Sequence, residues 1–434
     1  MRIVSKFALI LLLAVGLVIW FLLPWWALLA LLGVLGILLG ASRQGRRTLA
    51  ILRLGLTTLS QRIGASLVIL IGIAGVVGVL VALLAMSEGL TRVLHSTGSP
   101  DTAIVLRAGA TSELASGLTR SDVTLIRQKP GIAHNVKGQP LASPELVVIV
   151  NLPKKSSGTT ANVQLRGVGH VAWAVRPEIH IVKGRKFRPG FRELDVGVGA
   201  EQQFAGLGLG DTVQLGSQPW KVVGIFKAGD AHDSELWADA DTVASAFSRG
   251  GYQSVTVRLR SPGTLPAFRA ALTSDPQLKV QVQTTKKYYA AQSGRLTKTI
   301  RIVGFTVALI MAIGAVFGAL NTMYAAVSDR AREIATLRAL GFGGLPVATA
   351  VLLEAMVLAA LGGLLGGGIA WLLFNGYTVS TLGSNFSQLV FQFRVTPQLL
   401  FSGLKWALAI GLVGGLFPAL RAARVPVTVA LREL

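Results

Sequence analysis

Four long apolar segments constrain this chain more than any other feature of its sequence. A helix needs roughly 20 apolar residues to cross the hydrocarbon core of a bilayer, and each segment reaches that length. Only 14% of the 434 residues are charged, against about 25% in soluble domains. The sequence therefore predicts a polytopic α-helical membrane protein with four core transmembrane helices, at Ile63–Met86, Ile302–Val327, Pro346–Phe374 and Leu399–Leu420.

The N-terminal apolar stretch Phe7–Gly40 is too long for one span. As a single helix it would measure about 50 Å, whereas the hydrocarbon core is about 30 Å thick. Pro24, followed by two tryptophans, lies at its middle, where a turn with interfacial aromatic residues belongs. We expect an N-terminal hydrophobic hairpin with spans near Phe7–Leu23 and Trp25–Gly40. A signal peptide is the alternative, although no A-x-A-like cleavage site lies near Pro24.

Basic residues in short loops favour the cytoplasmic side of a membrane. Here they precede and follow the N-terminal hairpin, lie between the second and third core spans, and recur in the tail. The loop Asn375–Gln398 holds only Arg394. This pattern predicts six spans, cytoplasmic termini, and residues 87–299 on the outside of the membrane. The basic residues concerned are Arg2, Lys6, Arg43, Arg46, Arg47, Arg53, Arg62, Arg330, Arg332, Arg338, Arg421, Arg424 and Arg432.

The segment 87–299 is long enough for one or two folded units. A strand, a helix and a second strand are expected near each of its ends. This order predicts a large extracytoplasmic α+β domain, in which a split β-α-β (ferredoxin-like) unit carries a β-rich insertion at about 162–246. Within the insertion, Asp211–Phe226 is expected to be a hairpin with its turn at Gly216–Pro219. The bracketing elements are Thr102–Arg107, Arg120–Gln128, Pro144–Leu152, Tyr252–Arg260, Leu265–Ser274 and Lys279–Thr285.

The composition argues against catalytic chemistry. The chain has no cysteine, so a disulfide scaffold and a thiolate site are excluded. Its five histidines are scattered without an HExxH pattern, and no G-x-S-x-G motif occurs. We therefore expect no catalytic residue, no metal site and no bound cofactor. The net charge of +22 is spread over membrane flanks and the polar domain, so nucleic acid is not an expected partner.

Three polar segments of the domain are expected to be structural. Gly206–Asp211 lacks the full G-x-G-x-x-G pattern and a following helix, which favours a turn. His232–Trp237 groups a histidine with acids, and a solvated loop explains it better than a metal site. Lys183–Arg192 is expected to be a solvated basic face, with a phosphate or lipid headgroup contact as the alternative.

A short charged segment, Ser328–Val347, separates the second and third core spans. Strong helix formers run from Arg330 to Leu340, and Gly341 is placed to end the helix. Three apolar residues, Ile334, Leu337 and Leu340, form a stripe, but Glu333 falls inside it and Arg330 lies at its centre. Because burying a carboxylate in lipid is costly, this mixed face favours a cytoplasmic protein partner. An ordinary cytoplasmic loop is the alternative.

Glu354 is the lone acid within a span, and it lies nearer the cytoplasmic interface than the midplane. An intramembrane acid is a functional candidate, and a proton relay is one possibility. Lys405, the other ionisable residue of the spans, lies near the opposite face, so we favour a structural pair between Glu354 and a cytoplasmic-end arginine. The patterns Gly314-x-x-x-Gly318 and Gly362-x-x-x-Gly366 predict close helix packing.

Several of these segments resemble one family. The run "REIATLRALGFG", then "LLEA" in the next span and "PALRAARVPVTVALREL" at the end, is similar to permease subunits of the MacB/FtsX-like ABC transporters. "VLRAGATSELASGLTRSDVTLI" and "WKVVGIFKAGD" fit the MacB branch, and "LRLGLTTLSQRIGASLVILIGIAGVV" resembles its entry helix and first span. The resemblance covers about residues 48–434. The N-terminal hairpin departs from it, because a typical member has four spans.

The resemblance implies a permease of the inner membrane, with residues 87–299 periplasmic, that works as a homodimer or paralogue heterodimer with a cytoplasmic ABC ATPase. The helix at Asp329–Leu340 would be the coupling helix that docks on the ATPase. No G-x-x-x-x-G-K-[ST] motif occurs, so ATP and its magnesium are expected on a separate chain. The expected ATPase-binding residues are Arg330, Arg332, Glu333, Ile334, Leu337, Arg338, Leu340 and Gly341, with Glu354 as an intramembrane polar residue.

The expected function is export driven by that ATPase, with a periplasmic adaptor of the membrane-fusion type as a further partner. Alternatives are a permease that extracts lipoproteins or lipids, an FtsX-like transducer that activates a cell-wall hydrolase, and a membrane-anchored enzyme. The expected organisation is a hairpin (1–41), entry helix and first core span (42–86), periplasmic α+β domain (87–299), second span (300–327), coupling helix (328–345), third span (346–374), short periplasmic loop (375–398), fourth span (399–420) and cytoplasmic tail (421–434).

Overall fold

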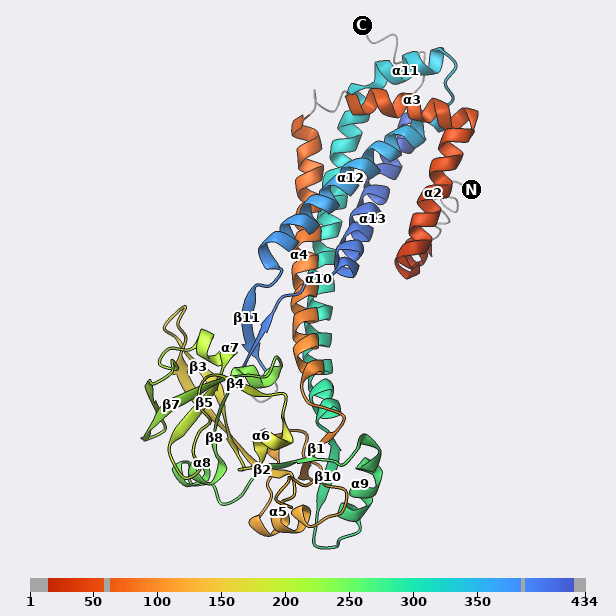
Figure 1. Cartoon of the computed structure of the whole chain (residues 1–434). Helices are drawn as coiled ribbons and strands as arrows, with labels where there is room; N and C mark the ends of the chain where they lie inside the picture. Colours follow the sequence, from red (N-terminus) through yellow and green to blue (C-terminus); the bar gives the residue numbers. More distant parts are fainter. Residues whose placement is uncertain (1–14, 58–62, 384–386, 425–434) are drawn as a thin grey trace. The chain divides into compact units, whose positions relative to one another are not determined.

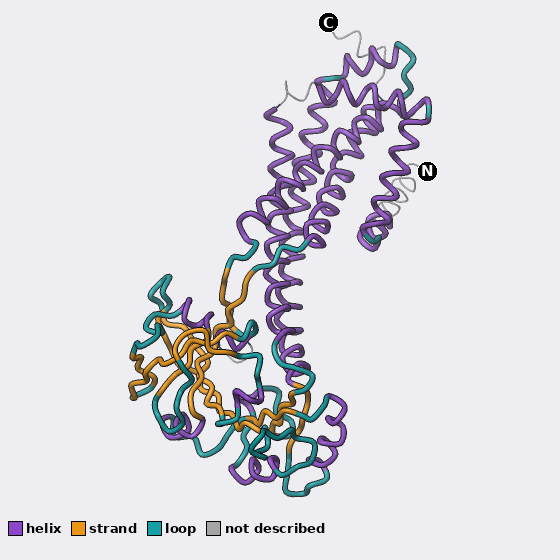
Figure 2. Tube along the Cα trace, viewed as in Figure 1, coloured by secondary structure: helices purple, strands orange, loops and turns teal. Residues whose placement is uncertain are grey.

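The computed structural model describes residues 15–57, 63–383 and 387–424. The chain divides into two compact units. A helical unit comprises Met1–Met86, Ile300–Asn375 and Arg394–Leu434, and an α+β domain comprises Ser87–Thr299 and Gly376–Phe393. Figure 1 shows the helices and strands of each unit, and Figure 2 shows that all the long helices are in or continuous with the helical unit.

Four helices of the described residues are long and apolar enough to cross a membrane. They are α4 (Ile63–Ser96), α10 (Thr285–Asp329), α12 (Gly344–Phe374) and α13 (Pro397–Ala422), and they confirm the four predicted core spans. Helix α10 has 45 residues and is about 68 Å long, more than twice the hydrocarbon thickness. It therefore continues well beyond any membrane-spanning part, without a break, into the α+β domain.

Two shorter helices precede the core spans. Helix α2 (Trp25–Ala41) and helix α3 (Arg43–Thr57) meet at a bend of 97°. Helix α2 has 17 residues. Against the six predicted spans, the described residues hold four candidates by length and composition, or five if the bent pair α2–α3 is one span. Residues 15–22 are helical up to the break at Pro24, whereas residues 7–14 of the first predicted span lie outside the described residues.

The break at Pro24 contacts α13. Because a proline cannot continue the hydrogen-bond ladder, carbonyl groups before it are left without helical partners. The ammonium of Lys405 donates to the carbonyl oxygens of Leu23 (2.5 Å) and Phe21 (3.3 Å). The Trp20 indole N–H donates to the Lys405 carbonyl at 3.1 Å. The carbonyl groups before Pro24 thus accept hydrogen bonds from the ammonium of Lys405, the only lysine of the predicted spans.

Glycines allow the core helices to approach closely. A Cβ added to Gly362 would lie 3.0 Å from the carbonyl oxygen of Leu70, and one added to Gly366 would lie 2.3 Å from that of Ala74. The predicted close packing at Gly362-x-x-x-Gly366 is therefore confirmed, against α4. At Gly314 and Gly318 an added Cβ meets no atom within 4 Å, so this pair makes no close contact with the described residues of the chain.

The α+β domain contains the predicted split unit. Strand order is β10-β1-β9-β2, and each neighbouring pair is antiparallel. Helices α5 and α9 pack their buried apolar residues, such as Ile126 and Phe268, against the sheet. This is the order of a split β-α-β fold, and it confirms the prediction. The elements are β1 (Thr102–Arg107), α5 (Arg120–Arg127), β2 (Ala142–Pro153), β9 (Ser254–Arg258), α9 (Leu265–Thr273) and β10 (Val280–Thr284).

The insertion extends the same sheet. Strand β3 pairs with the long strand β2, and the order continues β3-β8-β5-β7-β4, with β6 beside β7. The predicted hairpin is present, but its loop is only Gly216 and Ser217, because Leu215 pairs with Gln218 and Pro219 already lies in a strand. Strands are β3 (Thr160–Val168), β4 (His180–Gly184), β5 (Glu193–Gly197), β6 (Thr212–Leu215), β7 (Gln218–Lys227) and β8 (Glu235–Asp239). Helices are α6 (Ala172–Val175), α7 (Val198–Gln203) and α8 (Ala240–Ala246).

The segment expected as a short loop at 375–398 contains two strands, β11 (Thr378–Leu382) and β12 (Gln388–Gln392). They belong to the α+β domain. The Val390 amide donates to the Ser234 hydroxyl at 2.8 Å, and Gln203 donates to Ser380. Remaining elements are the 3-10 helices η2 (Glu113–Ala115), η3 (Ala231–Ser234) and η4 (Pro262–Thr264), and α11 (Ala331–Ala339).

Candidate coupling surface and buried charge cluster

Helix α11 is the short charged helix predicted between the second and third core spans. Helix α10 runs on through Ser328 to Asp329, and Arg330 occupies the N-cap position of α11 without a side-chain cap. At the other end Gly341 has φ of +91°. Its amide donates to the Arg338 carbonyl and the Phe342 amide to the Leu337 carbonyl, each at 3.1 Å. This is a Schellman motif, and it confirms Gly341 as the helix stop.

Arg330 ties the start of α11 to helix α12. Its Nη1 lies 3.0 Å from Glu354 Oε2, and its Nε lies 3.2 Å from Glu333 Oε2. The predicted pairing of Glu354 with an arginine is confirmed. Helix α3 leaves room for the pair at Gly55, where an added Cβ would lie 2.9 Å from Glu354 Oε2.

The predicted ATPase-binding residues divide into an exposed and a packed set. Glu333 is 60% exposed at its side chain, Leu340 is 72% exposed and Arg332 is exposed, whereas Leu337 and Arg338 are half-buried. Ile334 is only 6% exposed. This differs from its expected role as a partner-facing anchor, because Ile334 packs against this chain's own helices.

Helix α3 braces the far end of α11. The Arg47 guanidinium lies 3.5 Å from the Gly341 carbonyl oxygen and 5.8 Å from the centre of the Phe342 ring. One residue on, the Thr48 and Thr349 hydroxyls are 3.0 Å apart. The sequence alone does not single out these contacts. Basic residues on the amphipathic entry helix were the available signal, and they were used only for orientation.

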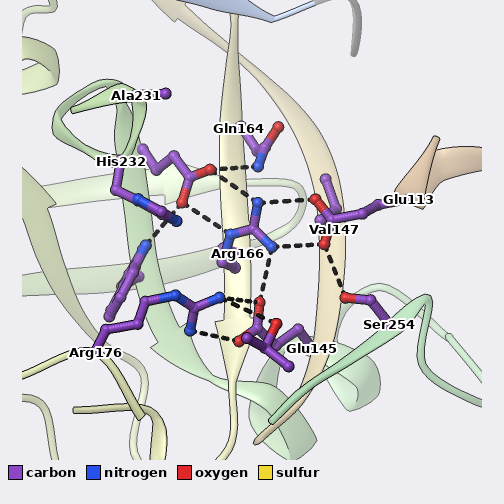
Figure 3. Close-up of polar contacts among 12 residues, drawn as sticks. Glu113, Glu145, Val147, Gln164, Arg166, Arg176, Ala231, His232 and Ser254 are labelled. Atoms are coloured by element: carbon purple, nitrogen blue, oxygen red, sulfur yellow. Dashed lines mark hydrogen bonds and ion pairs between the residues drawn. The ribbon is translucent and has the colours of Figure 1, made fainter. Parts of the chain in front are cut away.

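A second polar site lies in the α+β domain, around Arg166 on strand β3 (Figure 3). This guanidinium is 1% exposed and pairs with three carboxylates. Nη1 lies 2.8 Å from Glu113 Oε1 and 2.9 Å from Glu145 Oε2, and Nε lies 2.8 Å from Glu235 Oε2. The site is missed by sequence reasoning, because alternation in β3 places Arg166 on the face opposite the buried Leu165, where solvent is expected. Glu113 of η2 and the tyrosines Tyr288 and Tyr289 at the start of α10 cover that face instead.

Arg176 completes the cluster beside Glu145, with Nη1 2.6 Å from Oε1. Burial alone raises the pKa of Glu145, but Arg176 and Arg166 outweigh it and lower that pKa to about 2. Ser254 also donates to Glu113 at 2.8 Å. Burial raises the pKa of Glu235, but Arg166 and His232 outweigh it and lower that pKa. Glu145 and Glu235 therefore stay ionised and paired at neutral pH.

The segment His232–Trp237 is not a solvated loop, contrary to the sequence prediction. His232 is buried, its Nδ1 lies 2.9 Å from Asp230 Oδ1, and its ring contacts Trp237 and Tyr289 edge-on. The turn is buried because the aromatic rings and strand β12 cover it. Burial lowers the pKa of His232, but Asp230 and Glu235 raise it above its usual value. Among the described residues no group of three His, Asp or Glu side chains has the arrangement of a metal site.

The basic run Lys183–Arg192 is largely exposed, as predicted, but two of its arginines have a partner. Arg185 and Arg188 both contact the Glu193 carboxylate, at 2.6 and 2.9 Å. Hydrogen bonds from these arginines lower the pKa of Glu193 to about 2. Nearby Asp195 is buried and accepts from the Phe187 amide at 3.0 Å. Burial raises the pKa of Asp195 to about 7. Gly206–Asp211 forms turns, as predicted.

Comparison with known proteins decides the family. A model of the MacB-like periplasmic core domain matches residues 66–275, and a model of the FtsX-like permease C-terminal domain matches residues 305–427. This chain is a MacB/FtsX-like ABC transporter permease. The permease is 26% identical over 235 residues to YknZ, an uncharacterised ABC transporter permease of Bacillus subtilis, with 52% of this chain and 57% of YknZ aligned.

A second relative is the macrolide export ATP-binding/permease protein MacB 2 of Yersinia pestis. It is 28% identical over 239 residues, which cover 52% of this permease and 34% of that protein. The chain thus spans about half or less of the length of these relatives. Among solved structures, the extracellular domain of YknZ aligns with 42% of this permease at 18% identity and a TM-score of 0.33.

The two candidate sites fall in different family regions of this permease. Helix α11, Glu354 and the helix pair α12–α13 lie in the FtsX-like match, and the Arg166 cluster lies in the MacB-like match. The permease is a multi-pass membrane protein with a MacB-like domain.

Proposed function

We propose that this permease couples ATP hydrolysis by a separate cytoplasmic ATPase to movement of its α+β domain on the outside of the membrane, and that this movement drives export. The observation that carries the proposal is the construction of α11. This helix is short, presents Glu333, Arg332 and Leu340 outward, and is held at both ends by contacts within the chain.

The connection between α11 and the rest of the chain supports coupling. Arg330 follows directly on the last residue of α10 and binds Glu354 of α12. A displacement of α11 is therefore delivered to two helices together. Helix α10 continues without interruption to Thr285, inside the α+β domain, so it is suited to carry the displacement there.

The proposal includes an orientation and a set of partners. The termini and α11 are cytoplasmic and the α+β domain is extracytoplasmic, which agrees with the basic residues around α3 and α11. ATP and magnesium bind to the ATPase chain. A second permease copy and a periplasmic adaptor complete the assembly, as expected for export by MacB-like proteins.

The test is co-purification of the ATPase from native membranes with the tagged permease, followed by measurement of its stimulated ATP hydrolysis. Glu333→Arg places a like charge beside Arg330 on the docking face, which is costly at an interface. We expect it to reduce ATPase capture by about ten-fold or more, with normal membrane insertion. Glu178→Arg, a charge reversal at an exposed position of the α+β domain, is the matched control.

Normal capture and stimulation by the Glu333→Arg variant would show that α11 is not the docking element. The other captured chains separate the functions that use this architecture. A periplasmic adaptor supports export, whereas a lipoprotein or a cell-wall hydrolase in its place would replace export by extraction or signalling.

A further inference from the structure

The helical unit contains a cavity of about 410 Å³ under helix α11. We call it the α11 cavity. It lies among α3, the end of α10, α11 and the first half of α12. Its lining residues are Ile51, Leu54, Met323, Ala326, Val327, Arg330, Glu333, Ile334, Thr336, Leu337, Val347, Ala350, Val351 and Glu354.

Most of the residues that line the α11 cavity are apolar. Met323, Val327, Val347, Ala350 and Val351 are buried, and they come from the two helices that α11 joins. The side of the cavity next to solvent is formed by exposed Leu54 and Thr336. Cavities of about 300–1,000 Å³ with mostly apolar walls and a few polar groups are typical small-molecule sites. The volume suits one compact apolar body and is too small for a lipid with two acyl chains.

The polar groups at the cavity specify the charge of its occupant. Among the described residues three ionisable side chains line it, Arg330, Glu333 and Glu354, and the formal charges of these three sum to −1 (one positive, two negative). Arg330 lies between the two carboxylates, so its charge is already shared. A cationic group on the occupant adds an attraction to Glu333, whereas an anionic group meets two carboxylates.

We propose that the α11 cavity binds a small amphiphilic amine. Its apolar body packs among the buried side chains of α10 and α12, and its protonated amine lies beside the Glu333 carboxylate. An occupant in this position touches α11 and both helices next to it. If α11 transmits ATPase movement, as proposed above, such a ligand regulates coupling by holding α11 against α12.

Binding is tested on the full-length permease in phosphatidylcholine nanodiscs without any ATPase. The probe is a primary amine on a six-carbon chain that carries a photoreactive diazirine, and labelled peptides are identified by mass spectrometry. Probes with a hydroxyl or a carboxylate in place of the amine are the controls. We expect label on α10, α11 and α12 at the lining residues, with the amine about ten-fold more effective than the alcohol, equivalent to about 1.4 kcal/mol.

Two pairs of variants separate volume from charge. Ala350→Leu fills the cavity and is expected to abolish labelling, whereas Ala348→Leu, on the same helix and outside the lining, preserves it. Glu333→Gln removes the carboxylate and is expected to equalise amine and alcohol, whereas Asp329→Asn, exposed and outside the lining, leaves the preference. Equal labelling by both probes in the unaltered protein, unchanged labelling of Ala350→Leu, or a co-purified phospholipid that occupies the site would overturn the proposal.

The regulatory consequence has its own measurement. With the ATPase added, octylamine is expected to change stimulated hydrolysis in the unaltered permease and to have no effect on Ala350→Leu. Labelling without this effect would leave the binding site standing and remove the regulation. Failure of the Glu333→Arg capture experiment would remove the ATPase-coupling function, whatever the result of labelling.

Discussion

At the scale of single residues, Arg166 is the cation that forms ion pairs with three buried carboxylates. Taking one partner out of a buried ion pair leaves an uncompensated charge, which costs about 3–5 kcal/mol. We expect Arg166→Met to destabilise the α+β domain by this amount, measured by hydrogen exchange of the β2 and β3 amides in the full-length protein. Arg120→Gln breaks a pair exposed at both side chains and is expected to cost less than about 1 kcal/mol. Similar effects of the two variants would contradict the assignment.

Asp195 gives the domain a pH dependence of defined sign. Its pKa of about 7 lies above the unfolded value near 3.8, so the folded domain holds a proton that the unfolded chain has released. Stability contributed by this group is therefore lost as pH rises from about 4 to 7. As pH rises across that window, we expect the stability of Asp195→Asn to increase relative to the unaltered protein, by at most about 4 kcal/mol. Hydrogen exchange of β5 and β7 measures this difference.

Glu193, in the same strand as Asp195, gives stability a pH dependence of the opposite sign. Its pKa of about 2 is below its unfolded value, so its contribution is present above about pH 4.5 and lost as pH falls toward 2. Glu193→Gln is accordingly expected to differ most in stability from the unaltered protein at neutral pH.

For Asp195→Asn, a stability difference from the unaltered protein that stays constant between pH 4 and 7 would show that the Asp195 carboxyl is not held protonated.

Residue types alone did not reveal the Arg166 cluster or the carboxyl groups of Asp195 and Glu193. Glu145 and Arg166 lie at alternating positions that favour solvent on one face of the sheet. Their burial depends on η2, the residue that ends α6 and the start of α10, which come from distant parts of the chain. By contrast, the Glu354 pairing was predictable, because an acid near a span end requires a cation and arginines were available close by.

At the scale of elements, α11 depends on the left-handed backbone at Gly341. A residue with a Cβ at φ of +91° costs about 1–2 kcal/mol. We expect Gly341→Val to fray the last turn of α11, seen as faster hydrogen exchange at Leu340 and Phe342, and to lower ATPase stimulation. Gly343→Ala is the matched control, because Gly343 has φ of −66° and its added Cβ makes only ordinary contact. Equal protection in both variants would argue against a role of the Schellman motif.

The sequence predicts those helices and strands whose residue pattern lies within the segment itself. The core spans, the split β-α-β order and the β6–β7 hairpin follow from apolar runs and turn residues. The strands β11 and β12 were expected as a plain loop, because their partner surface on η3 and α7 is formed only by the folded domain. The start of α11 was also uncertain in sequence, since helix formers continue from α10 into it.

At the scale of the whole molecule, the absence of cysteine makes the membrane orientation directly measurable. Ser156→Cys lies in an exposed loop of the α+β domain, and Ala339→Cys lies on the exposed side of α11. In intact cells we expect a membrane-impermeant maleimide to label the first position and to reach the second only after permeabilisation. Labelling in the reverse order would invert the proposed topology. The unaltered protein, which has no thiol, is the blank.

The Arg166 cluster lies on the seam between two parts of one sheet. Glu113, Glu145 and Ser254 belong to the split unit, whereas Arg166, Arg176 and Glu235 belong to the insertion. Neither part is electrically balanced without the other. A chimera that exchanges the insertion between two permeases must therefore bring matching counter-charges, or it leaves two buried carboxylates in the host unit.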